Sequence, residues 1–359
     1  MRQKRQASNF MNRVKWGILG AGGIADRRTL PGMLLAENAE IYAVMELDEA
    51  AAGNLGMKYR AGAVYTNEDD LINDPRVDAV YIASPVVCHA RQVEKAARQK
   101  KHILVEKPVA MNSGESARLC ELCRKEGVLL ATGLMMRFHT YHQQMKQLIA
   151  EGKLGQIVSC HAQFTCWYPD IKGSWRQAKA SAGGGAMTDM GIHCLDLIEY
   201  ITGSHIALVG GLCDTMTFSY DVEDSASALF KLENGAFATV DANFNIPDEA
   251  AKCRLEIYGT RGSIRAEGTI GQTEGGTVLV TLSEEDKGYN AIQDRNVKED
   301  LQLAGADGNM YTKEIVSFSK SIINKTEAEV PAEDAARIQS VIEAIYESSE
   351  SGRFLKVQG

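Results

Sequence analysis

Three side chains of this sequence have the types and the spacing needed to move a proton to or from an oxygen atom. Lys107 lies in the tripeptide Glu106-Lys107-Pro108, and Asp189 precedes His193 by four positions. Residues four apart on a predicted helix share one face, so the carboxylate and the imidazole lie on the same side. An imidazole accepts a hydroxyl proton near neutral pH, and a fixed ammonium stabilises developing negative charge on the oxygen. This set suits the conversion of an alcohol into a carbonyl compound and the reverse.

A glycine-rich turn near the start of the chain indicates a dinucleotide site. Gly20 and Gly22 follow the apolar run 14–19, and Ala25 lies three positions after Gly22. Gly20 permits a tight turn, Gly22 lets a pyrophosphate approach the backbone, and Ala25 allows helix and strand to pack closely. The N–H groups at the start of the following helix favour a bound pyrophosphate. The predicted cofactor contacts in this turn are Gly20, Gly22, Gly23 and Ile24.

The residue at the end of the second predicted strand bears on the choice of cofactor. Glu46 follows the apolar run 41–45, where a carboxylate can accept hydrogen bonds from the adenine ribose hydroxyls. Residues 47–49 contain no arginine for a 2′-phosphate and carry negative charge that would repel it. The sequence therefore predicts NAD(H) rather than NADP(H). Lys58 and Arg60 would reverse that preference if the chain folded them back onto the site.

The elements that position these residues begin with an alternation of apolar runs and helical patterns. The apolar runs are 14–19, 41–45, 79–83, 103–105 and 128–132, and the helical patterns include 89–100 and 113–126. This alternation predicts a doubly wound parallel sheet, in which ligands bind at the carboxyl ends of the strands. Because Lys107 follows the fourth run at its carboxyl end, we expect it at that edge of the sheet.

Beyond about residue 140 the pattern changes to alternating strands with a few helices. Helices are predicted at 141–151, 309–324 and 332–348, and strands at 157–164, 226–232, 236–243, 253–258, 264–266 and 277–282. Asn234-Gly235 suits a type I′ turn between two of these strands. The predicted fold is α/β, with a parallel sheet followed by a mostly antiparallel sheet that has one open face. The expected division is a disordered leader at 1–13, a dinucleotide-binding domain at 14–138, a substrate-binding and oligomerisation domain at 139–335, and a C-terminal helix and tail at 336–359.

Charge and composition argue against several classes of protein. The 359 residues carry a net charge of −8, which argues against a general nucleic-acid binder. No apolar run is long enough to span a bilayer, and residues 1–13 lack the apolar middle of a signal peptide. The eight cysteines are scattered through apolar segments, so we expect reduced, buried thiols in a cytoplasmic protein. Cys120 and Cys123 have redox-motif spacing but fall within a helical pattern, which favours packing.

Three motifs in this order resemble the Gfo/Idh/MocA oxidoreductase family. They are Gly20-x-Gly22-x-x-Ala25, Glu106-Lys107-Pro108, and Gly183-Gly184-Gly185 followed by Asp189-x-Gly191-x-His193-x-x-Asp196. The resemblance runs from about Val14 to Val357. It implies a Rossmann domain and an α/β domain whose large open sheet often makes dimer or tetramer contacts. It also implies that Lys107, Asp189 and His193 form the catalytic set.

The segment after the third predicted strand departs from the family pattern. The family commonly has Thr-Pro-Asn-x-x-His there, whereas this chain has Ser84-Pro85-Val86-Val87-Cys88-His89, so Val86 replaces the usual asparagine. That change removes a polar contact near the nicotinamide ribose. The remaining cofactor contacts expected in this region are Ser84, Pro85, His89, Glu106 and Lys107.

The residues expected around the substrate are polar or aromatic. They are Arg137, His139, Tyr168, Trp175 and Arg176, together with Asp189 and His193. Aromatic faces stack on sugar rings while polar groups bind hydroxyls, so the expected substrate is a sugar, a polyol such as an inositol, or a glycoside. No metal is expected, because Lys107 supplies the positive charge that a metal would otherwise provide.

The main hypothesis is an NAD(H)-dependent oxidoreductase that interconverts a secondary alcohol and a ketone on such a substrate, for instance a dehydrogenase that forms a 3-keto glycoside. His193 takes the hydroxyl proton, Lys107 stabilises the oxygen, and Asp189 positions His193 or a substrate hydroxyl. One alternative is an NAD-dependent glycoside hydrolase that oxidises a ring carbon transiently and eliminates the aglycone. Another is a sugar- or nucleotide-sensing regulator without catalysis. We expect a homo-oligomer that binds neither nucleic acid nor membrane.

Overall fold

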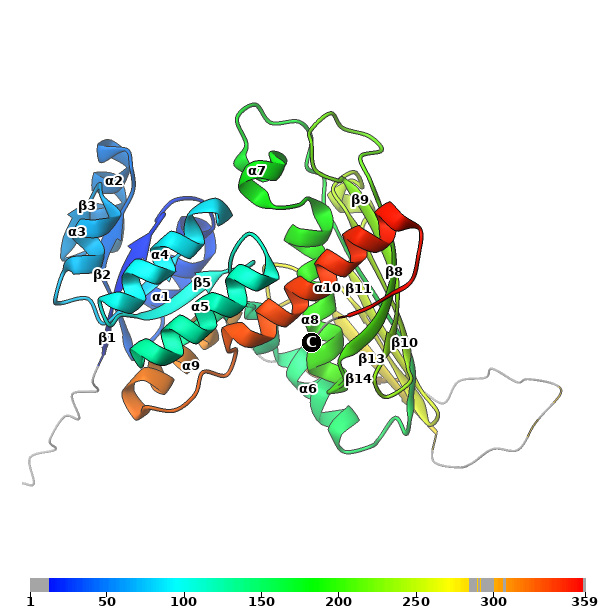
Figure 1. The fold of residues 1–359 in the computed structure, drawn as a ribbon. Coiled ribbons are helices and arrows are strands. Elements are labelled where there is room, and N and C mark those ends of the chain that lie inside the picture. The colour runs from blue at the N-terminus through cyan, green and yellow to red at the C-terminus, as the bar shows by residue number, and fades with distance from the viewer. Residues whose placement is uncertain (1–12, 284–288, 290, 292–299, 306–307, 358–359) are drawn as a thin grey trace, which may run out of the picture.

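The computed structural model describes residues 13–283, 289, 291, 300–305 and 308–357. They form two units, each built on its own sheet, with the first on the left of Figure 1 and the second on the right. Within these residues, no helix is long and apolar enough to cross a membrane. The predicted leader at 1–13 lies outside the described residues apart from Arg13.

The first unit contains a parallel sheet that begins with the strand before the glycine turn. Among the described residues it has six strands in the order β3-β2-β1-β4-β5-β6. Their bounds are β1 (Val14–Leu19), β2 (Ala39–Met45), β3 (Ala63–Tyr65), β4 (Ala79–Ile82), β5 (His102–Glu106) and β6 (Leu130–Gly133). The alternation predicted this sheet, except for β3, whose apolar run is only three residues long and partly exposed.

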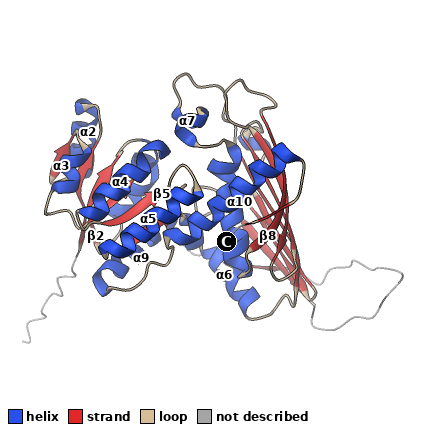
Figure 2. Cartoon of the chain, in the orientation of Figure 1, coloured by secondary structure: helices blue, strands red, loops and turns tan. Residues whose placement is uncertain are grey.

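Helices cover both faces of this sheet (Figures 1 and 2). Those in the first unit are η1 (Ala25–Thr29), α1 (Leu30–Leu34), α2 (Glu49–Tyr59), α3 (Glu68–Asn73), α4 (Val86–Arg98) and α5 (Ser113–Glu126). On β1, Trp16 and Ile18 pack with α1, whereas Leu19 packs on the opposite face in the core that includes α4 and α5. This alternation follows from the period of two along a strand.

Helix α9 (Met310–Asn324) covers the first sheet although it lies near the end of the chain. Trp16 of β1 packs against Phe318 with ring centroids 5.8 Å apart, and its indole N–H donates to Ser319 Oγ at 3.2 Å. The Asn38 amide donates to Val316 O at 3.0 Å. The expected division had grouped this helix with the second sheet. Sequence periodicity shows that a helix is amphipathic, but not which sheet its apolar face covers.

The second unit contains a larger sheet. In the described ranges it has nine strands in the order β14-β13-β12-β11-β7-β10-β9-β8-β15, and of the adjacent pairs only β7–β10 is parallel. Their bounds are β7 (Ile157–Thr165), β8 (Ile206–Asp214), β9 (Ser225–Leu232), β10 (Phe237–Asn243), β11 (Arg254–Gly259), β12 (Gly262–Glu267), β13 (Thr277–Leu282), β14 (Leu301–Gln302) and β15 (Leu355–Lys356). The mostly antiparallel sheet of the sequence prediction is confirmed.

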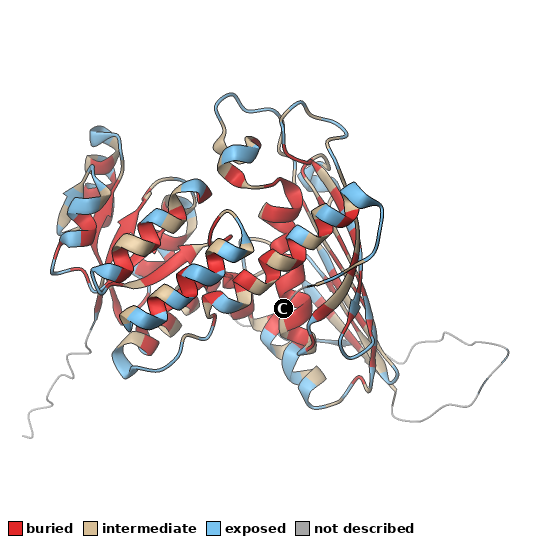
Figure 3. Cartoon of the chain, viewed as in Figure 1, coloured by how far each residue is buried: buried red, intermediate tan, exposed pale blue. Residues whose placement is uncertain are grey.

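Helices lie against one face of this second sheet and leave the other face open, as Figure 2 shows. The remaining helices are η2 (Met135–Phe138), α6 (Thr140–Ala150), η3 (Trp175–Gln177), α7 (Lys179–Ala182), η4 (Met187–Gly191), α8 (Ile192–Thr202), η5 (Asp248–Ala250) and α10 (Ala332–Ser351). Figure 3 shows buried residues concentrated on the helix-covered side. Helix α10 packs on both α5 and β8 and so joins the two units. The predicted boundary at 335/336 falls inside it.

The turn between β9 and β10 differs from the predicted type I′ turn. A type I′ turn needs positive φ at both central residues, but only Gly235 of the pair has one, at 90°. The Gly235 N–H donates to Leu232 O at 3.0 Å, and the Asn234 side chain accepts from Ala236 N–H. This geometry belongs to a three-residue loop, a type I turn followed by a left-handed glycine. The extra residue Glu233 lengthens the loop and changes the turn type.

The cysteine pair on α5 packs in the core, as its helical context favours. Cys120 and Cys123 are both buried and free, and burial raises the pKa of each thiol to about 12. Thiols with such pKa values are poor nucleophiles and poor metal ligands near neutral pH. Among the described residues, no cluster of three or more His, Cys, Asp or Glu side chains is arranged to hold a metal ion.

Candidate active site

A cavity of about 780 Å³ lies where the two units meet, at the carboxyl edge of the first sheet. From the first unit it is lined by Ile24, Arg27, Arg28, Ser84, His89, Glu106 and Lys107, among others. From the second it is lined by Tyr168, Trp175, Arg176, Thr188, Asp189, His193, Gln272 and Thr273. The topology of the first sheet puts the predicted cofactor residues at this edge, as it does in other doubly wound sheets.

The glycine turn after β1 has the close backbone approach that a dinucleotide needs. Gly20 has a φ of 73°, and a Cβ there would lie 2.8 Å from the backbone nitrogen of Ser84. Gly23 also has a positive φ, at 56°, with open space where a Cβ would be. Ile24 follows and lines the cavity. The turn therefore lets a ligand approach the backbone closely at the start of a helix, which fits a pyrophosphate.

Glu46 lies beside the turn, at the end of β2. Its Oε1 accepts a hydrogen bond from the Gly22 N–H at 2.6 Å, and a Cβ on Gly22 would lie 3.0 Å from the same oxygen. Lys58 does not reach this carboxylate, because its ammonium binds Asp26 Oδ1 at 2.6 Å. Arg60 ends α2 in the left-handed region with a φ of 53°. The carboxylate at this position is suited to accept hydrogen bonds from ribose hydroxyls.

Glu106 is held in place from both sides of β5. The Tyr81 hydroxyl donates to its carboxylate, and a Cβ on Gly133 of β6 would lie 3.2 Å from it. Burial raises the pKa of Glu106, although the hydrogen bond from Tyr81 and the charge of Lys107 oppose that rise. Since Glu106 lines the cavity while facing the interior of the first unit, it forms part of the wall beside Lys107.

His89 connects two loops at the edge of the sheet. Its Nδ1 lies 2.9 Å from Pro108 O and its Nε2 lies 2.9 Å from Ser84 O. The Ser84 hydroxyl donates to Gln92 Oε1, and Ser84 and His89 both line the cavity. Pro85 precedes the first residue of α4 and does not line the cavity. His89 therefore braces the segment that carries Lys107.

Lys107 and Asp189 meet across the cavity from the two units. The ammonium donates to Asp189 Oδ1 at 2.6 Å and to Asp189 O at 2.5 Å. Burial by itself would raise the pKa of Asp189, but the charges of Lys107 and Arg176 lower it to about 2. Asp189 is therefore ionised at neutral pH and holds the Lys107 ammonium toward the cavity. A cation fixed in this way can stabilise negative charge on a reacting oxygen.

The helix that carries Asp189 begins with a wide turn. Segment η4 has π-helical geometry and continues into α8, and the Ile192 N–H donates to Met187 O, five residues back. A π-turn offsets the ladder of backbone hydrogen bonds, and such turns are frequent at functional sites. Here the carbonyl of Asp189, inside that turn, accepts a hydrogen bond from Lys107. The wide turn thus presents both the side chain and the carbonyl of one residue to the ammonium.

His193 lines the same cavity. Among the described residues, no hydrogen bond joins it to Asp189. It is 4% exposed, and its Nδ1 is buried with no partner among the described residues. The pKa of His193 is lowered to about 3, mainly by burial. The positive charge of Lys107 also lowers this pKa, by more than the negative charge of Asp189 raises it. The imidazole is therefore neutral and able to accept a proton. Asp189 orients Lys107, whereas the sequence had left it to orient His193 or a substrate hydroxyl.

Three of the five other residues expected at the substrate line the cavity. Tyr168 packs against Phe244 with ring centroids 5.2 Å apart and donates to or accepts from Ser174 Oγ at 2.8 Å. The Arg176 guanidinium lies over the Trp175 ring, 4.4 Å from its centroid, and both line the cavity. These residues present an aromatic surface and a cation to the cavity that the Lys107–Asp189 pair also lines.

The structure does not bring Arg137 and His139 to the cavity. The Arg137 Nε lies 3.0 Å from both carboxylate oxygens of Asp196, and Nη1 lies 2.7 Å from Asp334 Oδ2. His139 is buried and accepts a hydrogen bond from the Tyr141 N–H at the start of α6. The positions of these two residues in the chain indicated proximity to the edge of the sheet, but a buried charge needs a partner and Asp196 provides one.

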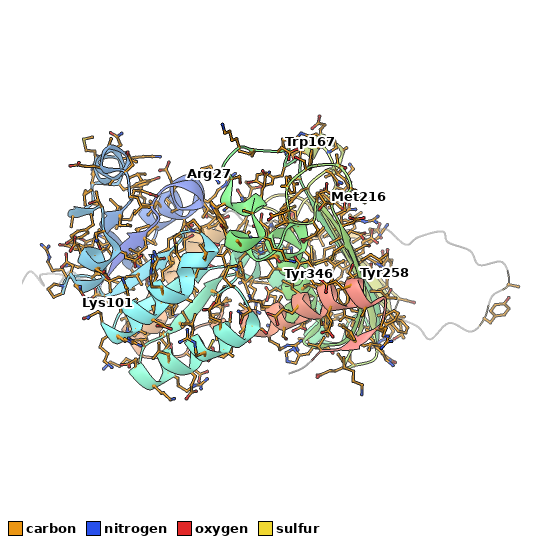
Figure 4. The ribbon with its side chains drawn as sticks, turned by 45° about the horizontal axis from the view of Figure 1, so that its top comes forward. Arg27, Lys101, Trp167, Met216, Tyr258 and Tyr346 are labelled. Atoms are coloured by element: carbon orange, nitrogen blue, oxygen red, sulfur yellow. The ribbon has the colours of Figure 1, made fainter. Side chains whose placement is uncertain are left out.

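Sequence reasoning missed several residues that line the cavity. Arg27 and Arg28 lie on the first helix, where Figure 4 labels Arg27, and Arg28 Nε donates to Gln272 Oε1 at 3.1 Å. Tyr311, on α9, has a buried hydroxyl with no partner among the described residues. The adjacent arginines after the glycine turn were a visible signal. The loop of Gln272 and the helix of Tyr311 reach the cavity only through tertiary packing.

Two family models match the chain. A model described as "Oxidoreductase family, NAD-binding Rossmann fold" matches residues 14–134, and one described as "GFO/IDH/MocA C-terminal domain" matches residues 142–265. The chain therefore belongs to the Gfo/Idh/MocA oxidoreductase family, with an NAD-binding Rossmann domain followed by the C-terminal domain of that family.

Individual relatives of this chain act on sugars, according to their names. The chain is 25% identical to 1,5-anhydro-D-fructose reductase of Ensifer adhaerens over 97% of this chain and 99% of the relative. It is 27% identical to D-xylose 1-dehydrogenase (NADP(+)) 2 of Haloferax volcanii over 94% of this chain and 98% of the relative. Its structure is similar to aldose-aldose oxidoreductase from Caulobacter crescentus complexed with glycerol, with a TM-score of 0.86, 25% identity, and coverage of 96% and 99%.

Proposed function

We propose that this protein is an NAD(H)-dependent oxidoreductase that interconverts a secondary alcohol and a ketone on a sugar, a polyol or a glycoside. The observation that carries the proposal is the contact between Lys107 and Asp189, which joins an ammonium from the first unit to a carboxylate from the second. His193 lines the same cavity, which Ile24 of the glycine turn also lines. The sugar-related names of the relatives support the substrate class.

The residues of the chain divide the work of the reaction. A dinucleotide held by its pyrophosphate at the glycine turn would supply a nicotinamide able to accept or return a hydride. His193, which burial keeps neutral in the free protein, accepts the hydroxyl proton as the carbonyl forms. Lys107 donates a hydrogen bond to the reacting oxygen. Asp189 keeps the Lys107 ammonium in place through two short contacts. Tyr168, Trp175 and Arg176 bind the remaining hydroxyls and ring faces.

The proposed cofactor is NAD(H) in preference to NADP(H). Glu46 places a carboxylate beside the turn, and Lys58 is engaged by Asp26. A 2′-phosphate would therefore meet the negative charge of Glu46. Titration calorimetry of the free protein with each dinucleotide tests this assignment. Tighter binding of NADP, the cofactor in the name of the Haloferax relative, would overturn it.

A substrate screen tests the proposed reaction. We would incubate the protein with NAD and panels of monosaccharides, inositols and glycosides, follow the absorbance of NADH, and identify the keto product by mass spectrometry. Accumulation of NADH with a product two mass units lighter supports the dehydrogenase. Release of the aglycone without net NADH would instead identify a hydrolase that returns its hydride. Tight binding of a sugar without turnover would identify a sensor.

The open face of the second sheet is the proposed contact between copies of the chain. It carries exposed apolar side chains, including Leu212 and Phe237, which are 72% and 56% exposed. Apolar side chains gathered on an uncovered sheet face favour association. Light scattering after size-exclusion chromatography should show a dimer or larger assembly, and Phe237→Asp should lower its mass. A monomeric wild type would exclude this contact.

A further inference from the structure

The start of the helix that carries Asp189 and His193 is capped by a side chain from a distant loop. Glu223 lies just before β9, and both of its carboxylate oxygens accept hydrogen bonds from this helix start. Oε2 accepts from the Gly185 N–H at 2.8 Å, and Oε1 accepts from the Met187 N–H at 2.9 Å. Its backbone carbonyl accepts the Ala186 N–H at 3.0 Å. One residue thus satisfies three successive N–H groups that a helix start leaves without intrahelical partners.

Tyr346 of α10 holds the capping carboxylate and one residue of the helix together. Its hydroxyl donates to Glu223 Oε1 at 2.7 Å and lies 2.7 Å from Thr188 Oγ1. The tyrosine hydroxyl has one proton and uses it in the hydrogen bond to Glu223. The Thr188 hydroxyl is therefore the donor in the second contact. Thr188 lines the cavity next to Asp189. Tyr346, labelled in Figure 4, lies where α10 meets this segment.

Two glycines allow this close packing. A Cβ on Gly185 would lie 2.0 Å from Glu223 O, and a Cβ on Gly184 would lie 2.2 Å from the Tyr346 hydroxyl. Any side chain at either position would push the cap away from the helix. The approach of Tyr346 and Glu223 therefore explains Gly184 and Gly185 of the Gly183-Gly184-Gly185 motif.

We propose that Glu223 and Tyr346 are positioning residues for the reaction proposed above, because they set the height and rotation of the wide turn that presents Asp189 to Lys107. Neither side chain lines the cavity. Asp189 lies two residues after Met187, the last N–H bound by the carboxylate of Glu223. A displacement of that turn would move the carboxylate and the carbonyl of Asp189 together, and with them the Lys107 ammonium.

A matched pair of variants separates positioning from stability. Glu223→Gln places an amide N–H₂ opposite at least one bound N–H, so a hydrogen bond at the helix start is lost. Glu199→Gln is the control, because Glu199 is similarly buried at the other end of α8. There it accepts the Ile206 N–H at 2.7 Å and pairs with Arg337. Both variants lose hydrogen bonds of a buried carboxylate, but only Glu223 is close to the wide turn that carries Asp189.

The kinetic readout is the split between kcat and KM with the substrate found by the screen. Glu223→Gln should lower kcat by about tenfold to a hundredfold, because displacements of about 1 Å at reacting groups have effects of that size. Its dissociation constant for NAD should stay at the wild-type value, since the glycine turn is untouched. Glu199→Gln should keep the wild-type kcat at a temperature where both variants are folded. An equal loss of kcat in the two variants would overturn the proposal.

A second readout does not depend on turnover. Hydrogen exchange followed by mass spectrometry should show faster exchange at 185–193 in Glu223→Gln and at 199–206 in Glu199→Gln. Unchanged exchange at 185–193 would refute the positioning role even if no substrate is found.

Tyr346→Phe keeps the carboxylate of Glu223 and is the variant to use if Glu223→Gln does not fold. It should show a smaller loss of kcat, and adding it to Glu223→Gln should cause little further loss, because both act through one network. Full additivity would contradict that coupling.

Discussion

Replacement of Lys107 by methionine tests the central contact of the candidate active site. Lys107 is 14% exposed at its side chain and donates to Asp189 Oδ1 at 2.6 Å. Methionine keeps most of the apolar length of the side chain and removes the charge. Loss of one preorganised donor to a developing oxyanion lowers kcat by about 10²–10³-fold in enzymes where it has been removed. We expect the same range for kcat of Lys107→Met, with NAD binding retained.

The same replacement has a predicted effect on stability. The pKa of Asp189 is lowered from 3.8 to about 2, so the unfolded chain binds its proton more readily than the folded protein. This stabilisation is complete above about pH 4 and is lost as the pH falls toward 2. It corresponds to at most about 2.4 kcal/mol. Because the Asp189 side chain is 35% exposed and Arg176 shares the effect, we expect Lys107→Met to lose about 1 kcal/mol at neutral pH.

Lys101→Met is the matched control. The Lys101 ammonium is buried and donates to Asp74 O and Val77 O, each at 2.8 Å, away from the cavity (Figure 4). Its loss leaves buried carbonyls without donors and costs about 1–3 kcal/mol of stability. Turnover at the NADH absorbance band and urea unfolding are measured on both variants. The reasoning is refuted if Lys107→Met retains more than about a tenth of wild-type kcat, or if Lys101→Met loses as much.

Three further predictions concern residues outside the reaction itself. His142 is fully buried and burial lowers its pKa to about 3, so the unfolded chain takes up a proton first as the pH falls below 6.5. Between pH 7 and pH 5 the wild type should therefore lose about 2 kcal/mol more stability than His142→Gln, measured by urea unfolding. Arg137→Met leaves Asp196 buried and unpaired, so it should lose about 3–5 kcal/mol while KM is unchanged; a raised KM without destabilisation would return Arg137 to the substrate site. Gly185→Ala should lose about 3 kcal/mol or more because its Cβ would lie 2.0 Å from Glu223 O. Gly53→Ala on α2, with open space around its Cβ, should gain about 0.4–1 kcal/mol, and similar thermal shifts in both glycine variants would contradict the packing argument.

Much of the fold could be predicted from local pattern. The helix predicted at 113–126 has those bounds in the structure, because Asn112 caps its start and Gly127 ends it with a φ of 70°. The strand predicted at 14–19 is β1. The turn at Asn234-Gly235 was misjudged because turn type depends on how the flanking strands pair, and that register is set by the whole sheet.

The chemistry of the candidate site was visible in residue types, but its connections were not. A lysine at a strand end and a carboxylate and an imidazole on one helix face are local features, and doubly wound sheets bring ligands to that edge. The sequence by itself therefore determined the family, the two sheets and the groups available for chemistry. Only the tertiary structure decided that Asp189 binds Lys107 and not His193, that Arg137 belongs to Asp196, and that Glu223 caps the catalytic helix. Each of those choices joins segments far apart in the chain, where packing of whole elements, and not local periodicity, sets which polar groups come within hydrogen-bonding distance.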